Sequence, residues 1–177
     1  SKEFLQLDLA ERISAHLREA ELDPRFLKLE ITESHIMENS ELAETILHRL
    51  RDLGIEMSLD DFGTGYSSLS YLHRLPVDRL KIDRSFISRM GNTGENREIV
   101  QTIIRLAQNL KMEVVAEGIE TMEQLTELAE MGCEYGQGYL FALPLDADEA
   151  KQFIEEHATS AAITLASPEA EQSEVLV

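Results

Sequence analysis

Residues 59–68 have the sequence LDDFGTGYSS, in which a strand pattern, two acids and a glycine loop follow one another. A hydrophobic run over residues 55–59 ends in two adjacent acids, Asp60 and Asp61. Carboxylates at the end of a buried strand are costly unless a cation or hydrogen-bond donors compensate them. The glycine loop that follows suits a site that closes over a ligand. The stretch therefore predicts the centre of an active site.

Strand and helix patterns alternate on both sides of this stretch. Such alternation predicts an α/β fold with a parallel sheet covered by helices. Two architectures fit the alternation, a doubly wound open sheet and a stretch of a (β/α)8 barrel. The expected strands are 26–32, 55–60, 79–82, 112–116 and 135–141, and the expected helices are 8–20, 40–53, 67–75, 95–110, 121–131 and 147–157.

Residues typical of helix ends flank several of these helices. Ser40 and Thr121 are expected N-caps, and Gly54 and Gly132 are expected to end helices. In the helix over 95–110, one apolar face is expected to point inward. That face consists of Ile99, Ile103, Leu106, Ala107 and Leu110.

Polar residues recur at the end of each expected strand, which distinguishes the two architectures. A single acid there is often only the N-cap of the next helix. Five successive strands with the same feature favour a shared site, because the strand ends of a parallel barrel lie on one face. Fingerprints of dinucleotide or P-loop sites are missing. The polar residues are Glu30, Glu33, Asp60, Asp61, Lys81, Asp83, Glu117, Glu120 and Gln137.

The chemistry of these side chains indicates a divalent metal. Glu30, Asp60, Asp61 and Glu117 offer hard oxygen donors, which suit Mg²⁺ or Mn²⁺ better than Zn²⁺. The histidines are scattered without the spacing of metal ligands and are expected at the surface. They are His16, His35, His48, His73 and His157.

The reaction that these groups favour is attack by water with metal assistance. The chain has no Ser-His-Asp order and no activated cysteine, so a protein nucleophile is not expected. Two divalent ions bridged by a carboxylate can generate hydroxide and hold a phosphoryl group. Lys81 then holds the water or stabilises charge; the structural alternative is a lysine that extends to solvent.

Composition excludes several partners. The 177-residue chain has a net charge of -18, which argues against binding a nucleic-acid polymer or an anionic membrane surface. Its single cysteine, Cys133, fits a reducing compartment and predicts a cytoplasmic location. No apolar run reaches the length of a transmembrane helix.

Five motifs follow one another along the chain: EITES at 30–34, DDFGTGYSSL at 60–69, LKIDRSF at 80–86, VAEGIET at 115–121 and QGYLF at 137–141. Together and in this order they resemble the EAL-domain family of cyclic di-GMP phosphodiesterases. Each motif alone is modest, whereas the DDFGTGYSSL segment together with the other four is specific. The similarity covers nearly all of residues 1–157.

The resemblance implies a TIM-type (β/α)8 barrel with one antiparallel strand. It implies hydrolysis of cyclic di-GMP to linear pGpG with two Mg²⁺ or Mn²⁺ ions. Glu30, Asp60, Asp61 and Glu117 then look like metal ligands, with Asp60 as the bridge. Glu117 has also been considered as the general base, and Lys81 looks like the lysine that contacts the attacking water.

The resemblance also implies roles around the ligand. Glu33 looks like the anchor of the loop that contains Gly63, Thr64 and Gly65. In the family that loop is mobile and linked to metal binding and dimer contacts, so a homodimer through the barrel is expected. Glu120 and Gln137 look like polar residues near the ligand.

The chain departs from the family at its start. The Glu-Ala-Leu motif and a metal-binding asparagine are not present, so residues 1–158 are expected to be a partial EAL domain with about five C-terminal βα units. Residues 159–177 are small and acidic and are expected to form a disordered tail. An incomplete barrel exposes edge strands and apolar faces, which predicts poor solubility or self-association. The chain alone is expected to be weakly active or inactive.

Two other functions remain open at this point. A degenerate domain could bind cyclic di-GMP and signal without catalysis, although the intact acids and Lys81 favour catalysis. Another metal-dependent barrel hydrolase is the third hypothesis. An upstream sensory or GGDEF domain is expected in the parent protein, which could also be anchored to a membrane through a missing N-terminal region.

Overall fold

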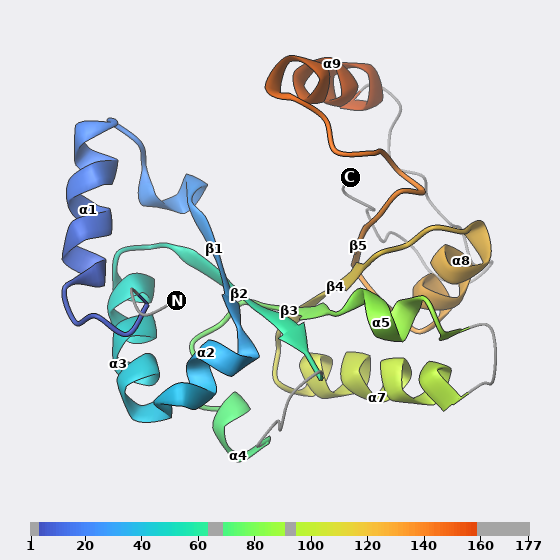
Figure 1. Cartoon of the computed structure of the whole chain (residues 1–177), viewed down its shortest axis with the longest axis horizontal. Coiled ribbons are helices and arrows are strands. Elements are labelled where there is room, and N and C mark those ends of the chain that lie inside the picture. The colour runs from blue at the N-terminus through green and yellow to red at the C-terminus, as the bar shows by residue number, and fades with distance from the viewer. Residues whose placement is uncertain (1–3, 64–68, 91–94, 159–177) are drawn as a thin grey trace. The chain divides into compact units, whose positions relative to one another are not determined.

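Helices and strands alternate along the chain, which confirms the predicted α/β class (Figure 1). The structure, a computed structural model, describes residues 4–63, 69–90 and 95–158. The predicted tail over 159–177 lies outside the described residues. The described elements are α1 (Leu9–Glu19), a 3₁₀ turn (Pro24–Phe26), β1 (Lys28–Thr32), α2 (Glu33–Glu38), α3 (Ser40–Asp52), β2 (Glu56–Phe62), α4 (Leu69–Leu72), β3 (Arg79–Ile82), α5 (Arg84–Ile87), α7 (Glu95–Asn109), β4 (Glu113–Glu117), α8 (Met122–Glu130), β5 (Tyr135–Gln137) and α9 (Ala147–Ala158).

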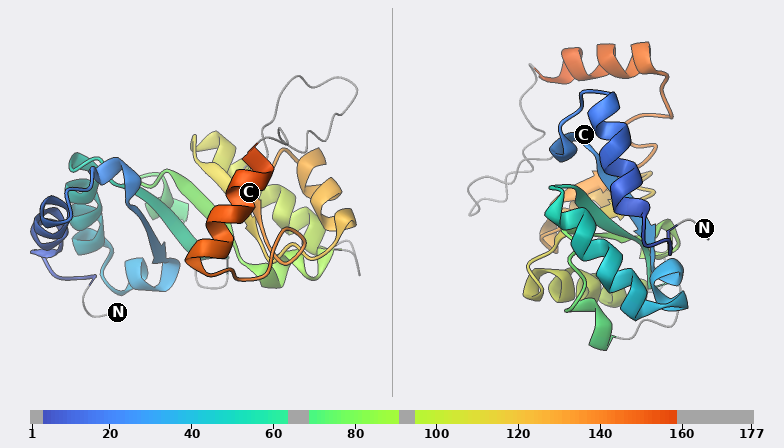
Figure 2. Two further views of the ribbon diagram at one scale, coloured as in Figure 1. Left: turned by 90° about the horizontal axis from the view of Figure 1, so that it is seen from above. Right: turned by 90° about the vertical axis from the view of Figure 1, so that its left-hand side faces the viewer.

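The chain divides into two units, and the first comprises Ser1–Lys81 with Asn109–Met112. Its strands follow the order β1, β2, β3, and β1 runs parallel to β2. The register pairs Lys28 with Glu56 and Thr32 with Asp60. Helices α1 and α3 lie side by side in this unit (Figures 1 and 2). Its most deeply buried side chains include Ile46, Leu47, Leu50, Met57 and Leu59.

The second unit comprises Ile82–Gln108 with Glu113–Val177. Strand β4 runs parallel to β5, and the register pairs Glu117 with Gln137. The residues of α7 that are buried, Val100, Ile103, Ile104 and Ala107, recur at helical spacing. The predicted inward face was therefore partly wrong, because Ile99 is 42% exposed and Val100 takes the inward position.

Two helices end at glycine as the sequence predicts. Gly54 and Gly132 have φ of 86° and 81°, a left-handed conformation that L side chains rarely adopt. Gly54 N donates to Arg51 O at 2.8 Å, and the next residue, Ile55, donates to Leu50 O at 3.3 Å. This bonding is a Schellman motif, and the same pattern recurs after α8.

The N-caps agree with the sequence in one case and differ in another. Thr121 caps α8 and forms a capping box with Gln124, which confirms the expected cap. Helix α3 begins at Ser40, and Asn39 is its N-cap, because the Asn39 side chain accepts from Leu42 N at 3.2 Å. Ser40 as the cap was therefore wrong by one residue.

Strand lengths differ from expectation at both ends of the predicted site. Strand β2 continues past the two acids to Phe62, whose side chain is only 5% exposed, so burial of that ring extends the strand. Strand β5 ends at Gln137 rather than at residue 141. A turn replaces the end of β5, and Phe141 N donates to Gly138 O at 3.1 Å.

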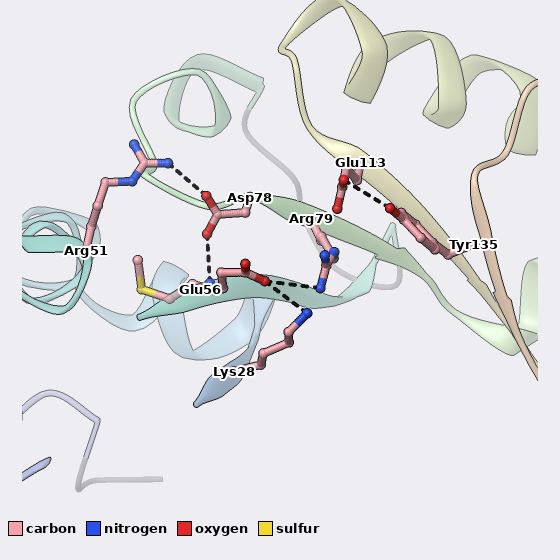
Figure 3. A network of polar contacts seen from close by, with 8 residues as sticks. Lys28, Arg51, Glu56, Asp78, Arg79, Glu113 and Tyr135 are labelled. Atoms are coloured by element: carbon pink, nitrogen blue, oxygen red, sulfur yellow. Dashed lines mark hydrogen bonds and ion pairs between the residues drawn. The ribbon is translucent and has the colours of Figure 1, made fainter. Parts of the chain in front are cut away.

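A polar network lies at the starts of β1, β2 and β3 (Figure 3). Glu56 Oε2 lies 3.0 Å from Lys28 Nζ and 3.4 Å from Arg79 Nη1. Asp78 accepts from the buried Met57 N at 2.8 Å and pairs with Arg51 at 3.2 Å. In the second unit, the Tyr135 hydroxyl donates to Glu113 Oε1 at 3.1 Å (Figure 3). In a parallel α/β fold, polar groups at this end stabilise the sheet.

No helix within the described ranges has the length and apolar character that crossing a membrane requires.

Asp78 provides a test of this network. Asp78→Ala leaves the buried Met57 N–H without its acceptor, so we expect a loss of about 1–3 kcal/mol in the free energy of unfolding. Urea denaturation measures it. Asp78→Asn keeps an acceptor and is expected to lose less. Lys151→Ala, which removes an exposed pair at 4.0 Å, is the control and is expected to change stability by about 0.5 kcal/mol or less. Equal losses in all three variants would contradict the assigned role.

Cys133 provides a second test. Desolvation raises the pKa of its thiol from 9.0 to about 12, so the nucleophilic thiolate is scarce near neutral pH. We expect a disulfide reagent at pH 8 to label the Cys133 thiol slowly in the native protein and much faster in the urea-unfolded protein. On raising the pH, the thiol ionises in the unfolded chain before it ionises in the folded protein. The stabilisation from burying the protonated thiol is therefore complete below pH 9 and is lost as the pH rises toward 12. Rapid labelling of the native protein would show that the thiol is accessible.

Candidate active site at the strand ends

The centre of the candidate site is a buried lysine on β3 between two acids. Lys81 Nζ lies 2.8 Å from Glu30 Oε2 and 3.3 Å from Asp60 Oδ1. The side chain of Lys81 is 7% exposed, that of Asp60 21% and that of Glu30 55%. A buried ammonium is costly unless carboxylates pair with it, and removing one partner of a buried pair is strongly destabilising. The three strands therefore present a charged cluster that the fold holds in place.

Strand alternation explains why these side chains meet. Successive residues of a strand point to opposite faces, so residues two apart share a face. Lys28, Glu56 and Arg79 form a first tier of two cations around one acid. Two residues further along β1 and β3, Glu30 and Lys81 meet in a second tier. In the second tier two acids surround one cation, so the charge pattern is inverted.

Asp61 has an unusual backbone. Its φ is 54°, in the left-handed region, although β2 continues through it. Asp tolerates this conformation better than most residues with a Cβ, at a cost of roughly 1–2 kcal/mol. The Asp61 N–H donates to Asp60 Oδ1 at 3.0 Å, which orients the neighbouring carboxylate. Strained residues of this kind cluster at functional sites.

Glu33 lies at the start of α2 and reaches the segment after β2. Its side chain is buried, 6% exposed, and its Oε2 accepts from Gly63 N at 3.2 Å. Gly63 has φ of 93°, so glycine is favoured where the chain leaves the strand. Thr64 and Gly65 lie outside the described residues.

A second group of predicted residues lies in the second unit. Glu117 ends β4, and its register partner Gln137 ends β5. Glu120 is exposed three residues beyond β4. Between the two acids, Ile119 N donates to Gln137 O at 3.1 Å and Leu140 N donates to Ile119 O at 3.0 Å. The segment that contains both acids is thus paired with the end of β5.

The remaining polar residues considered in the sequence lie in a helix cap or, for most of the histidines, at the surface. Asp83 caps α5, since its Oδ1 accepts from Ser85 N at 3.0 Å. The expected surface location of the histidines is confirmed for four of them. His16, His48, His73 and His157 are exposed, whereas His35 is half-buried and bonded to Thr32 Oγ1.

Two carboxylates of the first unit have the donor chemistry that a hard divalent cation prefers. Glu30 Oε2 and Asp60 Oδ1, from neighbouring strands, both face one cation, which is the Lys81 ammonium. Carboxylate oxygens are the ligands that Mg²⁺ and Mn²⁺ prefer. Within 4–63, 69–90 and 95–158, no three His, Cys, Asp or Glu side chains converge closely enough to hold an ion.

Some residues that support the site were not among those predicted from the sequence. The first tier, with Glu56 between Lys28 and Arg79, was not anticipated, although the two-residue spacing to Glu30 and Lys81 signals it. Gln124 was also missed. Its signal is the Thr-x-x-Gln spacing from Thr121, which is typical of a capping box.

The fold and the acids around Lys81 define the class of protein, an α/β chain with a charged site at the ends of parallel strands. The chain matches the EAL domain family over residues 1–144. It therefore belongs to the EAL domain family. The cyclic di-GMP phosphodiesterase NbdA of Pseudomonas aeruginosa is 47% identical over 159 residues, which make up 90% of this chain and 20% of NbdA.

Solved structures agree with the family. A PaMucR phosphodiesterase in complex with c-di-GMP has a TM-score of 0.80 at 40% identity, and the match covers 84% of this chain and 60% of that one. Klebsiella pneumoniae BlrP1 in a manganese/cy-diGMP complex has a TM-score of 0.73 at 33% identity, covering 80% of this chain and 36% of that one. The chain thus has the fold of part of an EAL barrel and spans only about a fifth of NbdA.

Asp61 offers a test of backbone strain at the site. Asp61→Gly and Asp61→Ala both remove the carboxylate, but only alanine retains the left-handed strain. We expect the alanine variant to be less stable than the glycine variant by about 1 kcal/mol, measured by urea denaturation.

The same pair of substitutions at Arg105 is the matched control. Arg105 is an exposed residue inside α7. In a helix, glycine is less stable than alanine by about 1 kcal/mol, so the order of stabilities should reverse. The same order at both positions would refute the strain at Asp61.

Proposed function

We propose that the complete EAL domain to which this chain belongs hydrolyses one phosphodiester bond of cyclic di-GMP and releases linear pGpG. The observation that supports this most directly is the convergence of Glu30 and Asp60 on the Lys81 ammonium, at 2.8 and 3.3 Å. Identity of 47% to a cyclic di-GMP phosphodiesterase supports the same substrate.

The proposed cofactor is a pair of Mg²⁺ or Mn²⁺ ions. Glu30, Asp60, Asp61 and Glu117 are the residues that would hold them, with Asp60 shared between the two. The bound ions would supply charge that stabilises the phosphoryl oxygens and lowers the pKa of water. The donor chemistry of Glu30 and Asp60 fits this assignment, and the family neighbour BlrP1 was solved with manganese.

The protein groups proposed to act on the attacking water are Lys81 and Glu117. Lys81 orients the water and stabilises developing negative charge, because its ammonium is buried and has little freedom. Glu117 is the proposed base that accepts the proton of the water. Glu120 and Gln137 are proposed to contact the substrate. Glu33 is proposed to hold the loop with Gly63, Thr64 and Gly65, a role supported by its bond to Gly63 N.

The wider setting is proposed from the same family. A homodimer through the barrel and an upstream sensory or GGDEF domain are the expected partners, in the cytoplasm. The relative MucR is named a bifunctional diguanylate cyclase/cyclic di-GMP phosphodiesterase, which supports an attached cyclase domain. Residues 1–158 are proposed to form the C-terminal part of the domain, with 159–177 as a tail.

Asp60→Asn in the complete domain tests the proposed function. It removes the charge of a proposed shared ligand while keeping the size of the side chain, so we expect turnover of cyclic di-GMP to fall at least about 100-fold. Glu30 still pairs with the Lys81 ammonium in this variant, so circular dichroism should show an intact fold, although its stability is expected to fall. Release of pGpG, followed by chromatography at fixed Mn²⁺, is the measurement.

Asp78→Asn is the matched control, because it makes the same chemical change at the start of β3 and should leave turnover within about three-fold. Mg²⁺-dependent activity retained in Asp60→Asn would overturn the metal assignment. A wild-type domain that binds cyclic di-GMP without cleaving it would be a sensor. Equal cleavage of a generic phosphate diester would indicate a different hydrolase.

A further inference from the structure

The segment from Glu117 to Glu120 is unusually constrained in its backbone. Gly118 has φ of 71°, and a Cβ at this position would lie 2.5 Å from Arg84 Cβ in α5. A Cβ on Gly138 would overlap the backbone of Ile119, so the turn after β5 lies directly against this segment. Ile119 is 1% exposed. Close packing therefore fixes the middle of the segment but does not reach its last residue, Glu120.

The amide of Gln124 holds that last residue. Gln124 Oε1 accepts from Glu120 N at 2.8 Å and from Thr121 N at 3.1 Å. The backbone N of Gln124 donates to Thr121 Oγ1 at 3.3 Å, which completes the capping box. One side-chain oxygen thus binds two consecutive backbone donors and sets the direction in which the chain leaves Glu120 and enters α8.

The other end of the same amide joins α8 to α5. Gln124 Nε2 donates to the carbonyl of Ile87, the last residue of α5, at 3.3 Å. Carbonyls at a helix end have no partner inside the helix, so this bond satisfies one of them. A capping box requires only the acceptor, which glutamate supplies equally well. The donor explains why an amide, rather than a carboxylate, occupies this position.

We propose that Gln124 is a positioning residue that fixes Glu120 for contact with the cyclic dinucleotide. The inference rests on the proposed function, in which Glu120 contacts substrate. Gln124 acts through the backbone of Glu120. Its hydrogen bond to Ile87 O fixes the start of α8 against the end of α5. Loss of the amide should leave the fold in place, because position 124 retains the backbone N–H that Thr121 accepts.

The decisive experiment is a double-mutant cycle on affinity for cyclic di-GMP in the complete domain. Gln124→Ala is expected to raise Kd about five-fold, the loss equivalent to one hydrogen bond. In the Glu120→Ala background the same change should alter Kd by less than about two-fold, because the residue that Gln124 positions is already gone. Additive effects would overturn the inference and leave the proposed function standing.

Gln108→Ala is the matched control. Gln108 Nε2 donates to Gly132 O at 3.1 Å, so it ties the C-terminal end of α8 as Gln124 ties the N-terminal end. We expect a similar small loss of stability with unchanged Kd. An equal rise in Kd for Gln108→Ala would mean that both residues act only through stability, which would also overturn the inference.

Amide hydrogen exchange provides a readout independent of ligand and activity. Gln124→Ala should speed exchange at Glu120 and Thr121, whereas Gln124→Glu, which keeps the acceptor oxygen, should preserve protection there. Unchanged exchange in Gln124→Ala would show that the amide does not hold Glu120. A wild-type domain that neither binds nor cleaves cyclic di-GMP overturns the proposed function and with it the substrate role of Gln124, whatever the exchange result.

Discussion

The buried ammonium of Lys81 is the interaction on which the first unit depends. A cation with 7% exposure needs partners, and Glu30 and Asp60 supply them from the two other strands of that unit. The cost of burying these charges is met only if all three strands keep their register, because a slip of one residue would turn each side chain to the opposite face. The same three groups are therefore a constraint on the fold and the centre of the proposed chemistry.

The two charged tiers place a stabilising network and the proposed site on one face of three strands. The first tier has two cations around Glu56 and lies at the strand starts (Figure 3). The second has two acids around one cation and lies nearer the strand ends. The two tiers thus carry opposite net charge and are two residues apart on β1 and β3. The excess of acid in the second tier is the charge pattern on which the proposed binding of divalent cations rests.

Much of this arrangement could be predicted from the sequence, and the exceptions have physical causes. Alternating patterns gave the order of strands and helices, and helix-ending glycines gave Gly54 and Gly132. The end of β2 was missed because burial of Phe62 outweighs the two acids before it. Short helices such as α2 and α5 have too few residues to show a period. The meeting of Glu30 with Lys81 depends on strand register, which local patterns do not determine.

Each unit holds its proposed functional residues by a different physical means. In the first unit, charge pairing and strand register place Glu30, Asp60 and Lys81, so the acids are fixed by their own side chains. In the second unit, Glu120 lies on a segment whose backbone is fixed by glycine contacts, by neighbouring backbone bonds and by the Gln124 amide. The Glu120 side chain is exposed, so it keeps rotamer freedom while its backbone is held. Such an arrangement suits groups that must adjust to a substrate, whereas charge pairing suits groups that must stay in place.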